Sequence, residues 1–164
     1  MSFYPPFGGV NGYVLLDTNL LLLLVVGLYD ENLIENHKRT SNFTKEDFAL
    51  LKKSIAHCRV IWVTSHCLAE VSNLLKQNRA NRNNKLMAFL NESVSQFKES
   101  HIEKTIVFKQ ECFSRLGVAD SAITVKAKRV DYVLTVDFDL YSEILKLGYN
   151  AINFNHLRLE HMLS

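Results

Sequence analysis

The sequence predicts an α/β fold, a three-layer sandwich in which helices flank a central, mostly parallel sheet. Short apolar runs that end at polar residues alternate along the chain with longer stretches of helical character. Strands that alternate with helices in this way favour a parallel sheet covered on both faces. The 164 residues, 48% of them hydrophobic, suffice for one packed core. We therefore expect a single domain over residues 1–164.

The first part of the chain predicts two strands and four helices. Thr44 and Asp47 have the spacing of a capping box, and Ser65 is the expected cap of a later helix. In order, we expect a strand at 12–16, a helix from 20, a polar loop or insertion at 29–43, a helix at 44–57, a strand at 60–64, and helices at 66–78 and 83–97. The last two would form a helical arm over 66–97.

The second part predicts two helices and two strands, preceded by one short extended stretch. Residues 104–108 are expected as a short strand or an extended connection, and a helix begins near Ala119, after Gly117. The expected elements that follow are a strand at 132–136, a helix at 140–147 that ends at Gly148, and a last strand at 151–154. No glycine-rich phosphate loop precedes any helix, which argues against nucleotide-cofactor enzymes.

Charge and composition limit the cellular setting. The 19 basic and 17 acidic side chains give a net charge of +2, too balanced to indicate a nucleic-acid partner by itself. The longest apolar run, 20–28, is shorter than the roughly 20 residues that span a bilayer, so we expect no membrane segment. Three scattered cysteines favour a reducing compartment, and residues 1–9 lack the basic start of a signal peptide. We expect a cytoplasmic protein.

Four acids define the candidate site. Asp17 and Asp137 are the first residues after two expected strands, and the carboxyl ends of parallel strands border the ligand crevice of open sheets. Asp120 opens a helix, and Glu70 lies about one turn inside another, at the margin of its apolar stripe. All four side chains can point toward the same crevice. We therefore predict an acidic cluster at the carboxyl edge of the sheet.

Such a cluster predicts a metal site. Clustered carboxylates repel one another, and a divalent cation relieves the repulsion. Ligands that are oxygen only favour Mg²⁺ or Mn²⁺, as one or two ions, and these ions accept phosphate oxygens as further ligands. The reaction that this chemistry suits is hydrolysis of a phosphodiester bond.

Each acid also has a structural interpretation. Asp17 and Asp137 could cap the helices that follow them, and Asp120 could stabilise a helix N-terminus. Glu70 is harder to explain in this way, because a carboxylate beside an apolar stripe is costly unless it is paired or hydrated. A catalytically inactive module that binds RNA or a protein partner therefore remains the alternative function.

The four acids lie in motifs that resemble those of the PIN-domain nucleases, which include the VapC-type ribonuclease toxins. The resemblance spans nearly the whole chain and rests on the stretches Val14–Asn19, Leu68–Val71, Val118–Ile123 and Val133–Leu140. It implies a metal-dependent endoribonuclease that acts on RNA, with Asp17, Glu70, Asp120 and Asp137 as catalytic residues and metal ligands. It further implies a cognate antitoxin if the protein is a toxin, and leaves a homodimer open.

Further roles follow from the same motifs. Thr18 or Asn19 would orient Asp17, and Thr135 would lie beside Asp137. Asp139 would be an additional metal ligand, or else a solvated acid at a helix start.

A basic stripe could contact the nucleic acid. Lys76, Arg79, Arg82 and Lys85 recur every three residues, which on a continuous helix gives a stripe able to follow a phosphate backbone. An ordinary solvated face, or a junction between two helices, explains the same pattern.

Overall fold

A five-stranded parallel sheet forms the centre of the computed structural model, which describes residues 11–77 and 84–164. The strands are β1 (Tyr13–Leu16), β2 (Val60–Thr64), β3 (Lys98–Ser100), β4 (Tyr132–Thr135) and β5 (Ala151–Asn153), in the order β3-β2-β1-β4-β5. All four pairings are parallel. The predicted α/β class with a parallel sheet between helices is therefore confirmed.

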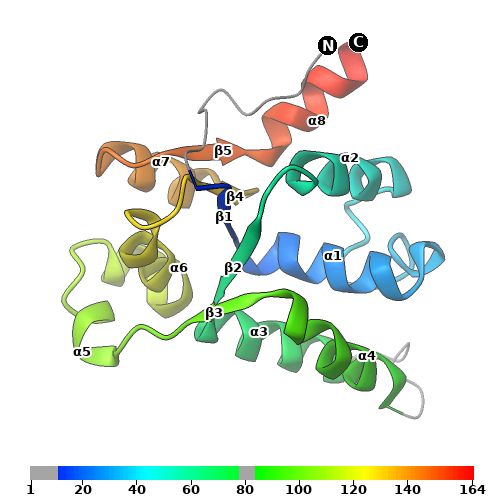
Figure 1. The fold of residues 1–164 in the computed structure, drawn as a ribbon, viewed down its shortest axis with the longest axis horizontal. Coiled ribbons are helices and arrows are strands. Elements are labelled where there is room, and N and C mark those ends of the chain that lie inside the picture. The colour runs from blue at the N-terminus through cyan, green and yellow to red at the C-terminus, as the bar shows by residue number, and fades with distance from the viewer. Residues whose placement is uncertain (1–10, 78–83) are drawn as a thin grey trace.

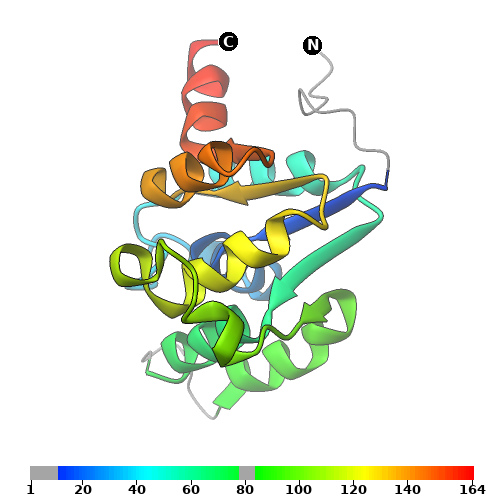
Figure 2. The ribbon, with the colours of Figure 1, turned by 90° about the vertical axis from the view of Figure 1, so that its left-hand side faces the viewer.

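Helices cover both faces of the sheet. They are α1 (Thr18–Tyr29), α2 (Lys45–Ile55), α3 (Ser65–Lys76), α4 (Lys85–Ser93), α5 (Lys104–Val107), α6 (Phe113–Ala127), α7 (Phe138–Lys146) and α8 (Phe154–Leu163), with 3-10 turns η1 (Glu31–Leu33) and η3 (Val94–Gln96). In Figure 1, α6 and α7 lie on one side of the strands, and α1 and α2 lie on the other. Figure 2 shows α6 crossing the face of the sheet. The sheet and the helices on its two faces thus form three layers.

Helix α1 is the centre of one layer. Its residues from Leu20 to Gly27 are all buried, because the helix packs against β4, α2, α3 and α4. A Cβ atom on Gly27 would lie 2.4 Å from the Phe48 ring, so glycine permits the close approach of α1 and α2. In the described residues, no helix has the length and apolarity that crossing a membrane requires.

Three elements differ from the sequence prediction. Residues 104–107 form the helix α5 instead of an extended piece, because one helical turn lets Val107 join Ile102 and Ala122 in a small second core. Strand β3 at the sheet edge and the terminal helix α8 were not predicted. The cap of α3 is Thr64, whose hydroxyl accepts from the Cys67 amide at 3.2 Å, and not Ser65.

The stretch between α1 and α2, expected as a polar loop, is folded against the main core, to which Ile34 and Phe43 belong. We call residues 31–43 the 31–43 segment. Its buried residues recur at every third position: Ile34, His37, Thr40 and Phe43. The Thr40 hydroxyl donates to the carbonyl oxygen of Ile34 at 2.6 Å, and the Arg39 amide donates to His37 Nδ1 at 3.2 Å. Buried side chains and hydrogen bonds therefore fix the segment, although its polar composition predicts a loop.

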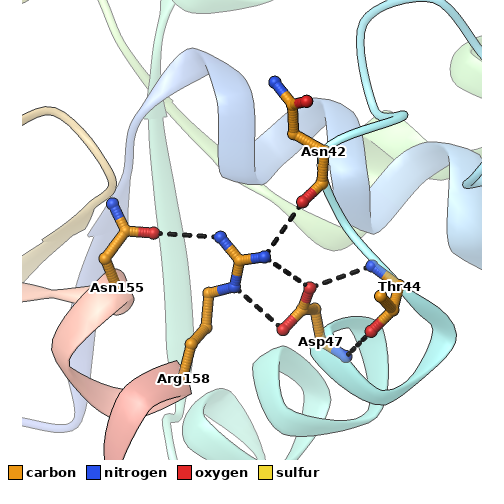
Figure 3. Close-up of polar contacts among 5 residues, drawn as sticks. All are labelled: Asn42, Thr44, Asp47, Asn155 and Arg158. Carbon is orange, nitrogen blue, oxygen red and sulfur yellow. Dashed lines mark hydrogen bonds and ion pairs between the residues drawn. The ribbon is translucent and has the colours of Figure 1, made fainter.

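Arg158 fastens α8 to α2 (Figure 3). Its guanidinium donates to both carboxylate oxygens of Asp47 at 2.9 Å, to the carbonyl of Asn42 at 2.9 Å and to Oδ1 of Asn155 at 3.1 Å. Asp47 also completes the predicted capping box with Thr44. A forked guanidinium suits this bidentate geometry, which an ammonium group would not reproduce.

Candidate functional site

Asp17 is the most constrained acid of the site. It follows β1 directly and caps α1, since Oδ1 accepts from the Leu20 amide at 2.9 Å. Its other oxygen, Oδ2, accepts from the Thr135 hydroxyl at 2.5 Å and from the Val136 amide at 2.9 Å. Burial raises the pKa of Asp17, and the hydrogen bonds from Thr135, Leu20 and Val136 oppose that rise. Three donors therefore hold this carboxylate in one orientation.

Asp137 follows β4 in the same manner. It caps α7, because its Oδ1 accepts from the Leu140 amide at 2.9 Å, and its side chain is otherwise exposed. The Asp137 amide donates to the Thr135 hydroxyl at 2.9 Å. Thr135 thus joins the two acids, since the same hydroxyl donates to Asp17. The pairing of β1 with β4 brings these ends together.

Glu70 reaches the site from α3. Its side chain is exposed, and Oε2 accepts from the Thr18 hydroxyl at 2.9 Å. Thr18, expected to orient Asp17, therefore contacts Glu70, and the neighbouring Asn19 is exposed. Beneath this pair lies the buried Cys67, whose pKa burial raises to about 11, helped by the charges of Asp17 and Glu70. The sequence gave no sign that Cys67 lies next to the acids.

Asp120 is close enough to the other three acids to feel their negative charges. It lies in the first turn after a break in α6 at Gly117, which has φ 83° and ψ −175°. Burial, followed by the negative charges of Asp137, Asp17 and Glu70, raises the pKa of Asp120 to about 7. Each of the other acids is therefore close enough to act on Asp120. The carboxyl edge of the sheet gathers four carboxylates from segments that are distant in the chain, which we call the acid edge.

Among residues 11–77 and 84–164, no basic side chain forms an ion pair with the acid edge. The ion pairs between described residues join Lys52 to Glu31, Arg115 to Glu143 and Arg158 to Asp47, and none of the three involves an acid of the edge. Asp139 is exposed in the first turn of α7, where a helix start favours an acid. The negative charge thus collects without a paired cation in the described part of the chain.

The four carboxylates of the acid edge are chemically suited to bind a divalent cation. All four groups offer carboxylate oxygens, which Mg²⁺ and Mn²⁺ prefer. Over residues 11–77 and 84–164, however, no three Asp, Glu, His or Cys side chains are arranged to hold a metal ion. Asp17 is fixed by three donors, whereas Glu70 and Asp137 are exposed and each accepts one hydrogen bond. Binding of an ion would therefore require carboxylates of the acid edge to move from the positions they hold here.

The predicted basic stripe is divided between two helices. Lys76 is exposed at the end of α3, and Lys85 is exposed at the start of α4. Arg79 and Arg82 lie outside the described residues. Lys76 and Lys85 therefore lie on different helices, and not on one continuous helix.

Known proteins give no independent guide to this site. No family model, curated protein or solved structure matches the chain. The geometry and charge of the acid edge are therefore the structural features from which a function can be inferred.

Proposed function

We propose that this protein is a metal-dependent endoribonuclease of the PIN type, in which Asp17, Glu70, Asp120 and Asp137 act together on a phosphodiester bond of RNA. One observation carries the proposal: burial, together with the negative charges of the other three acids, raises the pKa of Asp120 to about 7. Carboxylates brought this close are costly for the fold, and a role in binding a cation gives a reason for the cost. RNA as substrate follows from the resemblance of the motifs.

The acids have different parts in this proposal. Asp17 is the fixed reference, because donors on both of its oxygens prevent rotation. Glu70 and Asp137 are exposed, so they can meet a ligand that arrives from solvent. A divalent cation held there would lower the pKa of water and neutralise phosphate charge. Without a cation, the raised pKa of Asp120, about 7, favours its neutral form below neutral pH, which lessens the repulsion.

The proposed setting follows from the same resemblance. A ribonuclease of this type acts in the cytoplasm, and a toxin would have an antitoxin that covers the acid edge. Such a partner would present a basic side chain, since the edge is negative.

The test is cleavage of a labelled single-stranded RNA with Mg²⁺ or Mn²⁺. We expect Asp120→Asn to lower the rate roughly 100-fold or more, because even residues that only support metal ligands cost about 10–100-fold when they are changed. The matched control is Glu160→Gln, which removes one exposed charge on α8. Activity should vanish in EDTA. Equal rates for wild type and Asp120→Asn, in protein free of contaminating nuclease, would refute the proposal.

A second candidate is a catalytically inactive module. The observations that favour it are the capping roles of Asp17 and Asp137 and the lack of a preformed metal arrangement in the described residues. Melting curves with Mn²⁺ separate the two functions. A real site at 100 times its dissociation constant adds about 2.7 kcal/mol of stability, whereas an inactive module gains little.

A further inference from the structure

A second site lies where the 31–43 segment meets the end of α3. A pocket of about 90 Å³ is lined there by Lys38, Arg39, Leu74 and Gln77. Three of these side chains can donate hydrogen bonds, two of them carry positive charge, and none is an acid. A pocket with this lining suits an anion.

The two basic residues of the pocket, Lys38 and Arg39, lie in a turn whose backbone is held in place. Lys38 and Arg39 are exposed, but His37 before them and Thr40 after them are fully buried. The Thr40 and His37 hydrogen bonds hold the turn that presents both side chains. The ion pairs between described residues involve neither Lys38 nor Arg39. Both charges are therefore available to a ligand, and little backbone ordering is needed to present them.

The pocket and the acid edge share one face of α3. Glu70, Leu74 and Gln77 stand at positions i, i+4 and i+7, which lie above one another on a helix. Seven residues of helix span about 10.5 Å. One strand of a stacked nucleic acid advances about 3.4 Å per phosphate, so this span corresponds to about three nucleotides.

We infer that this pocket binds a backbone phosphate of the RNA strand, about three nucleotides from the bond held at the acid edge. The inference rests on the proposed function. Four carboxylates repel a polyanion, so the affinity of the strand has to come from basic groups away from the acids. Lys38 and Arg39 supply such groups at a spacing that one strand can bridge.

The test compares two double variants that remove the same charge. Lys38→Ala/Arg39→Ala alters the pocket, and Lys128→Ala/Arg129→Ala alters an exposed Lys–Arg pair just before β4, at the opposite edge of the sheet. Fluorescence anisotropy in EDTA, with a labelled ten-nucleotide RNA, gives the dissociation constant at several salt concentrations. Melting curves verify that both variants fold.

We expect the pocket variant to bind the RNA about tenfold more weakly and the control variant to bind as wild type does. The slope of log K against log salt should fall by about 0.7 to 1.4, for one or two lost phosphate neutralisations on a single strand. Equal affinities for the two double variants would overturn the inference.

The outcomes separate this inference from the nuclease proposal. Normal cleavage by Asp120→Asn, together with weak binding by the pocket variant, would retain the pocket and discard the nuclease. Loss of cleavage in Asp120→Asn, with equal binding by both double variants, would do the reverse. A wild-type protein that binds no RNA would overturn both.

Discussion

The acid edge and the basic pocket both border α3, but they are built in different ways. The acids come from four separate segments, and Thr135 bonds to Asp17 across 118 positions of the chain. The pocket's cations are consecutive residues of the 31–43 segment, which is held by local turns. The acid edge therefore depends on the topology of the whole sheet, whereas the pocket depends only on the 31–43 segment and the end of α3. A change to the sheet and a change to the segment should have separable effects.

The largest effect should come from the hydroxyl that joins the two strand ends. Thr135→Val keeps the volume but leaves Oδ2 of the buried Asp17 and the Asp137 amide without this partner. Hydrogen bonds to charged groups contribute about 1.5 to 3 kcal/mol, and each kcal/mol lowers the melting temperature of a chain this size by roughly 2–4 °C. Thr135→Ser, which keeps the hydroxyl, should retain more of the stability.

Thermal denaturation of Thr135→Val gives the measurement, with the exposed Thr105→Val as the control. A melting temperature equal to that of the control would mean that the Asp17 carboxylate does not need this donor. The acid edge would then be less dependent on sheet topology than we infer.

A smaller effect should follow from a change in the 31–43 segment. Thr40→Val removes the buried hydrogen bond to the carbonyl of Ile34 and should cost about 1 kcal/mol, or roughly 2–4 °C in melting temperature. RNA binding should weaken, because the turn that presents Lys38 and Arg39 loosens, while the acid edge is untouched. Ser41→Ala, at an exposed neighbour, is the control. If Thr40→Val lowers the melting temperature but leaves the RNA affinity unchanged, RNA binding at the pocket does not depend on an ordered 31–43 segment.

The smallest effect should be a gain of stability on removing one acid. Burial and three neighbouring charges raise the pKa of Asp120 from 3.8 to about 7, so between these values the folded chain holds a proton that the unfolded chain releases. The free energy of unfolding therefore falls as pH rises through this window. In EDTA at pH 8, Asp120→Asn should melt about 1–2 °C above wild type, a modest gain because water screens a partly exposed group.

Melting curves from pH 4 to pH 8 provide the measurement. The difference between Asp120→Asn and wild type should disappear near pH 4, where both side chains are neutral. Glu160→Gln should show no such pH-dependent difference. A variant less stable than wild type at pH 8 would show that Asp120 is not under repulsion.

The sequence was informative where a strand ends. Asp17 and Asp137 were identified because a buried strand, a polar residue and a helix follow one another, and that order places an acid at the carboxyl edge. The parallel sheet followed from the same alternation. Partners across the sheet, such as Thr18 for Glu70, depend on side-chain directions that spacing does not fix.

Irregular and short elements were harder to predict. The 31–43 segment has a polar composition because only every third residue is buried, and a turn repeat of that kind resembles a loop. Strand β3 has three residues at the sheet edge, too few for a pattern. Helix α8 is held by the buried Phe154 and by Arg158, whose partners Asp47 and Asn42 lie more than 100 positions earlier in the chain.

The central place of β1 also has a consequence for synthesis. Asp17 leaves the ribosome 118 residues before Thr135, the donor that orients it. At 5–20 residues per second, that interval is roughly 6 to 24 s. During this interval β1 lacks its neighbour β4, and Asp17 lacks the Thr135 hydroxyl. Any nuclease activity can therefore begin only once the last quarter of the chain is being translated.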